Sequence, residues 1–220
     1  MEQLVIKIER QVNDKIFWQE YSLDFQANKS VFWWLKKIGE QLDPTLAFEC
    51  SCNAGLCGAC AVNVNGRALL SCKELIQYAQ PITIRPLSNL PIVKDLVIDW
   101  RHVDSKLRER TAWLFADYLP NTAEYAMDVE HTALDKRLAG CINCAICASV
   151  CPILAKGGFE YPWVFVKGQR LVIDPNVPQE LQQQVRVDLA AKADKCIGCG
   201  ACERSCPKAV NPVASVQSFV

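Results

Sequence analysis

The sequence predicts an α+β domain over residues 1–100 and an all-α domain over residues 101–220. Three observations predict this division. Apolar and polar residues alternate in the first part, as they do in β-strands. From about Asp99 the apolar residues recur with helical spacing. The cysteines also change pattern, with one irregular group in the first part and two matching runs in the second.

Strand-like segments stand at residues 4–9 (LVIKIE), 61–66 (AVNVNG) and 82–87 (ITIRPL). Residues 30–42 (SVFWWLKKIGEQL) read as one amphipathic helix, and Ser30 is a suitable N-cap. Strands around one helix predict a small α+β domain.

Three helices are predicted in the second part, over residues 104–119, 128–140 and 178–194. Gly140 directly precedes the first cysteine run, where it is suited to end a helix. The two runs form the internal repeat of the chain.

Composition and charge limit the classes of function that the chain can have. Lysine plus arginine and aspartate plus glutamate each number 24, so the charge does not point to nucleic acid. The chain has no apolar run near the roughly 20 residues that span a bilayer, and residues 1–10 do not resemble a signal or transit peptide. We therefore expect a reducing cytoplasm, where 13 cysteines indicate metal rather than disulfides.

The first cysteine group has the spacing C-x4-C-x2-C, followed by a distant fourth cysteine. This is the plant-type [2Fe–2S] spacing, in which each iron takes two thiolates. Gly55 and Gly58 allow the tight loop to direct N–H groups at sulfur. A zinc site is the weaker alternative, because zinc usually uses two short pairs. The predicted ligands are Cys52, Cys57, Cys60 and Cys72.

Cys50 is left over beside this loop. We interpret it as a bystander, with a ligand or redox role as the alternative, since Cys50 and Cys52 would point the same way in a strand.

Residues 141–152 (CINCAICASVCP) and 196–207 (CIGCGACERSCP) both follow C-x2-C-x2-C-x3-C-P, the bacterial ferredoxin pattern. In that pattern the fourth cysteine of each run ligates the other cluster. The middle cluster is therefore predicted on Cys141, Cys144, Cys147 and Cys206, and the third cluster on Cys151, Cys196, Cys199 and Cys202. Chance or structural zinc is the alternative.

No residue is assigned a catalytic role. His102 and His131 lie in charged helical stretches and are interpreted as surface residues, and there is no phosphate-binding glycine motif. Substrate chemistry is expected on another polypeptide.

The order of the cysteine groups resembles the iron–sulfur subunits of succinate dehydrogenase and fumarate reductase over nearly the whole chain. The resemblance includes VNVNGRALLSC (62–72), PLSNLPIVKDLVIDW (86–100) and CPKAVNP (206–212). It implies a β-grasp plant-type [2Fe–2S] ferredoxin domain and a bacterial-ferredoxin-like domain. It also implies an FAD-containing catalytic subunit as partner, with electrons passing through the [2Fe–2S], [4Fe–4S] and third clusters to a quinone.

Cys199 departs from this resemblance. Common relatives replace that cysteine and carry a [3Fe–4S] third cluster, whereas a fourth thiolate here favours [4Fe–4S]. Such a chain is similar to a less common, variant branch of the family.

The residues at the positions of the family's quinone pocket also differ from those of common relatives. ILAKGG (153–158) follows Pro152 where relatives have Ser and a Trp pair, and Ile197 stands where they have His. Trp163 could substitute, but packing beside Tyr161 and Phe165 is the simpler interpretation. The resemblance therefore allows either a membrane anchor or a cysteine-rich heterodisulfide-reductase-like subunit, with the chain peripheral on the inner face of a prokaryotic membrane.

The leading hypothesis is the electron-transfer subunit of a succinate dehydrogenase or fumarate reductase complex. The alternatives are a subunit of another flavin dehydrogenase or a thiol-linked fumarate reductase, a free-standing ferredoxin, and a zinc-stabilised binding module.

Overall fold

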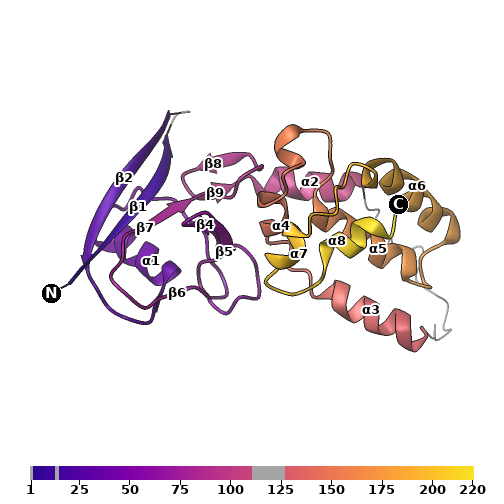
Figure 1. Ribbon diagram of the computed structural model, residues 1–220, viewed down its shortest axis with the longest axis horizontal. Coiled ribbons are helices and arrows are strands. Elements are labelled where there is room, and N and C mark those ends of the chain that lie inside the picture. Colours follow the sequence, from indigo (N-terminus) through magenta and orange to yellow (C-terminus); the bar gives the residue numbers. More distant parts are fainter. Residues whose placement is uncertain (1, 13–14, 111–126) are drawn as a thin grey trace. The chain divides into compact units, whose positions relative to one another are not determined.

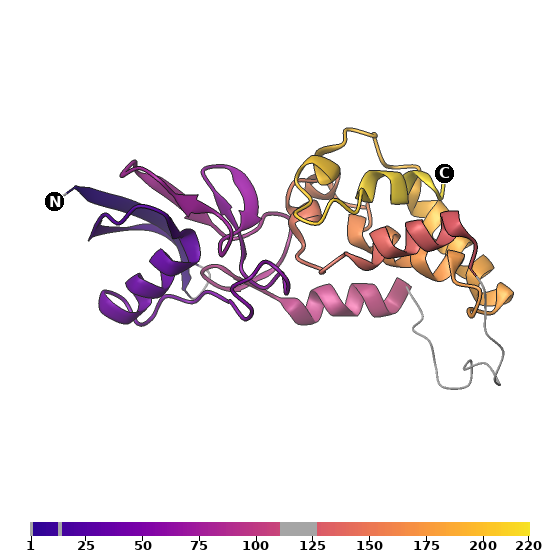
Figure 2. The ribbon, with the colours of Figure 1, turned by 90° about the horizontal axis from the view of Figure 1, so that it is seen from below.

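The computed structural model describes residues 2–12, 15–110 and 127–220. These residues form two compact units. The first holds Met1–Asp99 together with Ile142–Ser149, and the second holds Trp100–Cys141 and Val150–Val220. Figures 1 and 2 show that strands around helix α1 dominate the first unit and helices the second. The fold is thus the predicted combination of a β-grasp-like domain and a helical domain.

The first unit is built on a five-stranded mixed sheet with strand order β2-β1-β7-β4-β5. Strand β1 pairs antiparallel with β2 and parallel with β7, whereas β4 pairs antiparallel with both β7 and β5. The bounds are β1 (Gln3–Val12), β2 (Lys15–Asp24), β4 (Ala61–Val64), β5 (Arg67–Leu70) and β7 (Ile82–Arg85). The three predicted strands are therefore confirmed.

Alternation in β1 buries one face of the sheet. Leu4, Ile6 and Ile8 are fully buried, because successive side chains of a strand point to opposite faces. Their core is shared with α1 (Val31–Gln41), which buries Trp34 and Ile38 among other apolar side chains. Ser30 caps α1 as predicted, since its Oγ accepts the Trp33 N–H at 3.1 Å.

Short strand pairs complete the unit. β3 (Lys29–Ser30) pairs with β6 (Leu75–Ile76), and β8 (Ile92–Lys94) pairs with β9 (Val97–Ile98).

A buried arginine ties these parts together. Arg10 of β1 is 2% exposed and forms ion pairs with Asp43, just after α1, and with Asp95, between β8 and β9. The Asp95 carboxylate also accepts the backbone N–H groups of Gln11 and Ala47, at 3.0 and 2.9 Å. Arg10 was not singled out from the sequence, because its partners Asp43 and Asp95 lie far along the chain.

Helix α5 (Pro162–Ile173) is the centre of the second unit. It packs against four other helices, α2 (Trp100–Arg110), α3 (Val129–Ala139), α6 (Gln179–Ala193) and α8 (Pro212–Gln217). Gly168 allows the close approach of α6, because a Cβ at that position would lie 2.2 Å from Leu189 Cδ1. Three short helices are α4 (Ile146–Ser149, in the first unit), η2 (Leu154–Lys156) and α7 (Ala201–Arg204).

Two predicted helices are confirmed, as α3 and α6. The helix predicted over 104–119 begins earlier, at Trp100, and is described to Arg110, while residues 111–119 lie outside the described part of the chain. Gly140 does follow α3, although its φ of −63° is right-handed rather than the left-handed conformation common at helix ends. Within the described residues, no helix combines the length and apolarity that a membrane crossing needs.

Candidate metal centres

The loop that carries the first cysteine group is folded around one sulfur atom. The backbone N–H groups of Ala54, Leu56 and Cys57 donate to Cys52 Sγ at 3.4, 3.2 and 3.3 Å. Left-handed backbone at Asn53 and Gly55 turns the loop so that these donors converge. Their hydrogen bonds lower the pKa of Cys52 to about 6. The loop therefore favours a thiolate at this position before any metal is bound.

The four predicted [2Fe–2S] ligands form two neighbouring pairs. The Cys52 thiol interacts with the Cys57 thiol. On the other side, burial and the adjacent Cys60 thiol raise the pKa of Cys72 to about 12. Two pairs of thiols suit a cluster in which each iron takes two thiolates. The donor set and the cradle of N–H groups thus fit a [2Fe–2S] cluster, which would deprotonate these thiols on binding.

Cys50 lies beside this loop but is engaged differently. Its thiol donates to Asn53 Oδ1 at 2.7 Å. Burial raises the pKa of Cys50, with smaller contributions from the thiols of Cys60, Cys57 and Cys52. Cys50 is therefore close to the predicted site while its own hydrogen is directed at an amide oxygen.

The predicted middle-cluster ligands are divided between the two compact units. Cys144 and Cys147 are buried, at 9% and 8% exposure, in the segment that belongs to the first unit. Cys141 and Cys206 belong to the second unit, where both pack against the apolar cluster of Leu138, Val166 and Val210. The structure therefore brings Cys141 and Cys206 to one shared core.

The predicted third-cluster ligands line a single cavity in the second unit. Cys202 is partly buried, and burial followed by the thiols of Cys151, Cys196 and Cys199 raises its pKa to about 11. Most of the other side chains at this cavity are apolar, and they belong to Pro152, Ile153, Phe159, Pro162, Ile197, Ala201, Val213 and Val216. Four thiols around a largely apolar cavity suit an iron–sulfur cluster, and Cys199 and Ile197 are exposed to solvent at its edge.

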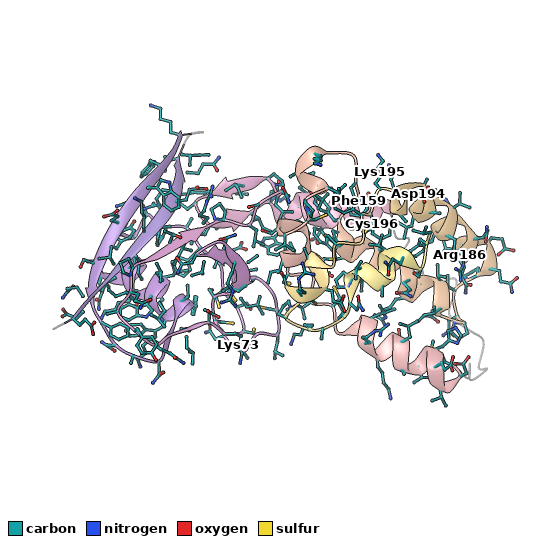
Figure 3. The ribbon with its side chains drawn as sticks, in the orientation of Figure 1. Lys73, Phe159, Arg186, Asp194, Lys195 and Cys196 are labelled. Atoms are coloured by element: carbon teal, nitrogen blue, oxygen red, sulfur yellow. The ribbon has the colours of Figure 1, made fainter. Side chains whose placement is uncertain are left out.

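Local backbone geometry shapes the second run. Gly198 and Gly200 adopt φ values of +64° and +69°, which residues with a Cβ rarely adopt. Lys195 Nζ donates to the Gly158 carbonyl at 2.6 Å and joins the start of this run to the segment after Pro152 (Figure 3). The grouping of the thiols suits a cluster better than a single ion. Among the described residues, no three or more His, Cys, Asp or Glu side chains converge closely enough to hold one metal ion, whereas a cluster of several irons spreads its ligands over a larger site.

The two histidines differ in their surroundings. His131 is exposed and lies 2.6 Å from Asp128 through its Nδ1. The prediction that His102 is a surface residue was wrong. It is half-buried, and its Nε2 lies 3.1 Å from the Tyr161 hydroxyl. The packing of α5 against α2 covers it, which helical periodicity in a charged stretch could not reveal.

Trp163 packs as an ordinary core residue. It is 1% exposed, and its ring stacks on Tyr161 with the centroids 4.4 Å apart. Trp163 does not line the cavity of the third cysteine group.

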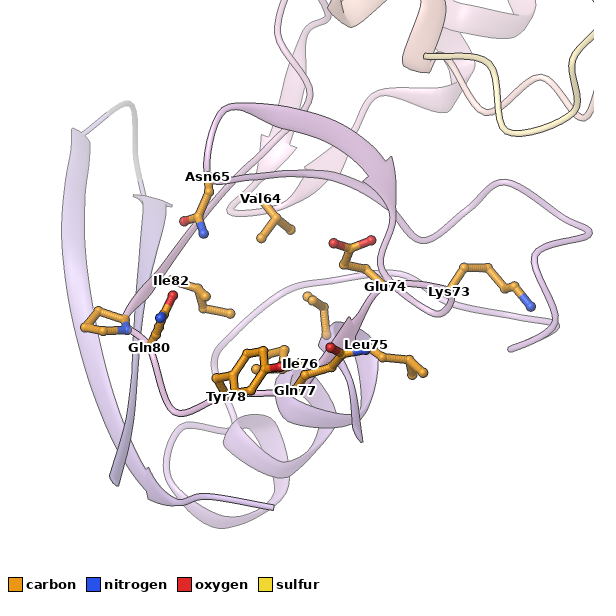
Figure 4. A pocket seen from close by; sticks show the side chains of 12 residues that line it. Val64, Asn65, Lys73, Glu74, Leu75, Ile76, Gln77, Tyr78, Gln80 and Ile82 are labelled. Atoms are coloured by element: carbon orange, nitrogen blue, oxygen red, sulfur yellow. The ribbon is translucent and has the colours of Figure 1, made fainter. Parts of the chain in front are cut away.

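The first unit also contains a pocket of about 560 Å³ that was not predicted from the sequence. It lies beside β6, and the charged residues in its lining are Lys73 and Glu74 (Figure 4). The Lys73 side chain points away from the other labelled residues and reaches the cluster loop, since a Cβ at Gly55 would lie 2.9 Å from Lys73 Cγ.

Fold and cysteine arrangement define a two-domain protein built to carry several iron–sulfur clusters. Family profiles agree: residues 4–105 match the 2Fe-2S iron-sulfur cluster binding domain, and residues 137–210 match the 4Fe-4S dicluster domain.

The fumarate reductase iron-sulfur subunit of Mycobacterium tuberculosis is 30% identical over 230 aligned positions, which span 100% of this chain and 92% of that protein. The succinate dehydrogenase iron-sulfur subunit of Paracoccus denitrificans is 29% identical over 84% of this chain and 73% of its own length. The chain therefore belongs to the family of iron–sulfur subunits of succinate dehydrogenases and fumarate reductases.

Two further relatives extend the comparison. One subunit of the fumarate reductase (CoM/CoB) of Methanothermobacter marburgensis is 29% identical over 94% of this chain, which spans 41% of that protein. A chain of the Mycobacterium smegmatis Sdh1 complex in the apo form has the same fold, with a TM-score of 0.86 and 20% identity over 99% of this chain and 93% of its own.

Proposed function

We propose that this chain relays electrons one at a time between an FAD-containing catalytic subunit and a quinone-linked membrane-side subunit. Residues 1–100 would hold the [2Fe–2S] cluster, and residues 101–220 would hold a [4Fe–4S] middle cluster and the third cluster. The arrangement of the predicted ligands supports this proposal. The [2Fe–2S] loop and Cys72 together supply two pairs of thiols, and four thiols line the cavity in the second unit. Substrate chemistry would take place on the flavin of the partner.

We propose that the third cluster is [4Fe–4S], with Cys151, Cys196, Cys199 and Cys202 as ligands. The observation that carries this assignment is the position of Cys199, which lines the same cavity as the other three cysteines. A fourth thiolate at this cavity can hold the fourth iron of a cubane.

Electron paramagnetic resonance of the air-oxidised, isolated complex tests this assignment. An oxidised [4Fe–4S] cluster gives no signal, whereas an oxidised [3Fe–4S] cluster gives a sharp one. We expect no such signal and about ten irons per chain. A signal near full occupancy with about nine irons would refute the fourth ligand. If the wild type gives no signal, Cys199→Ala should create the three-iron signal. Cys50→Ala should not, because it removes a thiol outside the predicted ligands.

The partners follow from family membership and from the departures at the quinone pocket. We propose that the chain is held on the inner face of the cell membrane by a cysteine-rich heterodisulfide-reductase-like subunit or by a membrane anchor. Burial of Trp163 supports the cysteine-rich partner, because a core tryptophan does not replace the aromatic residues of the usual pocket. Purification through a tag on this chain should recover a flavoprotein, and its absence would contradict the proposal.

A thiol-linked fumarate reductase is the second candidate. The similarity to the fumarate reductase (CoM/CoB) of Methanothermobacter marburgensis over 94% of this chain favours it. The isolated complex would then reduce fumarate with a dithiol as electron donor. A complex that reacts with quinols and not with thiols would exclude this candidate.

A further inference from the structure

A segment of the first twin run is attached to the first unit. Residues 142–149, called here the middle-run segment, belong to the same compact unit as the [2Fe–2S] loop. Ser88 donates its backbone N–H to Ser149 Oγ at 2.9 Å. Asn89 Nδ2 donates to the carbonyl oxygens of Ala148 and Ser149 at 2.9 and 3.3 Å. Polar side chains and backbone groups thus fasten this segment to residues 88–89, which lie some 60 positions earlier in the chain.

The [2Fe–2S] loop touches the middle-run segment at Gly58. A Cβ built on Gly58 would lie 2.9 Å from Cα and Cβ of Cys144 and 2.9 Å from the Ile142 carbonyl oxygen. Real Cβ atoms essentially never approach other heavy atoms this closely. Gly58 also has a φ of +81°, so two independent features require glycine here. The contact therefore leaves no room for a side chain at position 58.

Predicted ligands of two different clusters flank this contact. Cys57 directly precedes Gly58, and Cys60 follows two residues later. Cys144 itself is buried, at 9% exposure, on the opposite side of the contact. A bulkier residue at position 58 would therefore push one ligand loop away from the other.

We propose that Gly58 is a positioning residue that sets the distance between the [2Fe–2S] loop and the middle-run segment, which carries Cys144 and Cys147, two predicted ligands of the middle cluster. The hydrogen bonds of Ser88 and Asn89 hold this distance fixed. The inference rests on the proposed function. In the proposed relay, one electron would pass from the reduced [2Fe–2S] cluster held by the first loop to the oxidised middle cluster, with no bond or proton transferred. Because electron tunnelling falls off steeply with distance, a small displacement of either loop slows this step.

The test compares Gly58→Ala with Gly66→Ala in the complete complex. Gly66 has nearly the same φ, +82°, but a Cβ there would meet nothing within 4 Å. Both variants therefore carry similar backbone strain, and only Gly58→Ala adds the steric contact. The complexes are reduced with dithionite, and the magnetic interaction between the two paramagnetic clusters is measured through their spin relaxation. The electron-transfer rate between the clusters is measured after flash photoreduction.

We expect Gly58→Ala to weaken the magnetic interaction and slow the transfer, while Gly66→Ala matches the wild type. Equal values in both variants and the wild type would overturn the role of Gly58. If Gly58→Ala loses its [2Fe–2S] signal, Asn89→Ala decides instead, because it removes two hydrogen bonds without entering the loop. A weaker interaction in Asn89→Ala supports the proposal, and an unchanged one overturns it.

Failure of the proposed function gives a different result. A wild-type complex with both clusters assembled but without magnetic interaction or electron transfer between them would contradict the electron relay itself. A normal wild type with an unaffected Gly58→Ala would contradict only the positioning role.

Discussion

The Cys50 thiol donates to Asn53 Oδ1 at 2.7 Å, across the turn that opens the [2Fe–2S] loop. Asn53 has a φ of +52°, a conformation that asparagine tolerates better than most residues. The next residue, Ala54, supplies the first of the three N–H groups directed at Cys52. The bond therefore connects the Cys50 thiol, which is not a predicted ligand, to the left-handed backbone at Asn53. That backbone conformation directs the N–H groups of the loop at Cys52.

The first prediction concerns the potential of this cluster. Cys50→Ala should leave the [2Fe–2S] cluster in place but lower its midpoint potential. Hydrogen bonds to ligand sulfur stabilise the reduced form of a cluster. Loss of the bond between Cys50 and Asn53 should loosen the loop that holds the N–H donors to Cys52. Asn53→Gly should have a similar effect, because glycine keeps the backbone conformation but lacks the amide acceptor. A redox titration followed by electron paramagnetic resonance measures both.

The double variant supplies the control. Cys50→Ala with Asn53→Gly should shift the potential no further than either single change, since both remove the same bond. Additive shifts would contradict the coupling. Loss of the cluster in Cys50→Ala would instead make Cys50 a ligand.

The second prediction concerns the pH dependence of stability. Hydrogen bonds from Thr45, followed by those from Tyr21 and Arg10, hold the pKa of Asp43 well below its usual range. A carboxyl group whose pKa is lowered by folding contributes stability above its unfolded pKa, and this contribution is lost as the pH falls. Asp43→Asn should therefore reduce the free energy of unfolding by roughly 1.5–3 kcal/mol at neutral pH, as expected for hydrogen bonds to a charged group.

The difference between wild type and Asp43→Asn should stay constant at neutral pH and shrink below about pH 4, where the unfolded carboxyl becomes protonated. Urea unfolding followed by tryptophan fluorescence, at matched pH values, measures the difference. Glu40→Gln is the control, because Glu40 pairs with Lys36 on the surface at 3.6 Å and such pairs contribute at most about 1 kcal/mol. A difference that grows on acidification would contradict the assignment.

The cysteine groups could be predicted from the sequence because their ligand spacing is local. Cys196, Cys199 and Cys202 lie within one short run, and the structure places them at one cavity with Cys151. Strand β1 was also predictable, since its apolar and polar residues alternate regularly, and the structure shows the same alternation of buried and partly buried side chains. These features depend on neighbours along the chain.

Other features depend on tertiary contacts. Helix α5 was missed because residues from Pro162 to Val166 are all buried, which leaves no polar face to give a helical period. Strand β2 was missed because its first residues, including Ile16 and Trp18, are apolar but exposed. The attachment of Ser149 to Ser88 joins positions 61 residues apart, and cysteine spacing says nothing about it.

The third prediction concerns the packing of α5 on α6. Gly168→Ala should destabilise the second unit by about 1–3 kcal/mol, the usual cost of overpacking a core. The new methyl group would occupy the space of Leu189 Cδ1, and Leu189 is fully buried and cannot turn outward. Leu189→Ala alone should cost about 2–5 kcal/mol, because it leaves a cavity.

The two changes together should cost less than their sum, since the alanine methyl at position 168 enters the space that Leu189 vacates. Thermal unfolding of the four proteins, with iron content checked in each, measures this coupling. Simple additivity would show that α5 and α6 move apart to accept Gly168→Ala, and the close helix contact would then not depend on glycine.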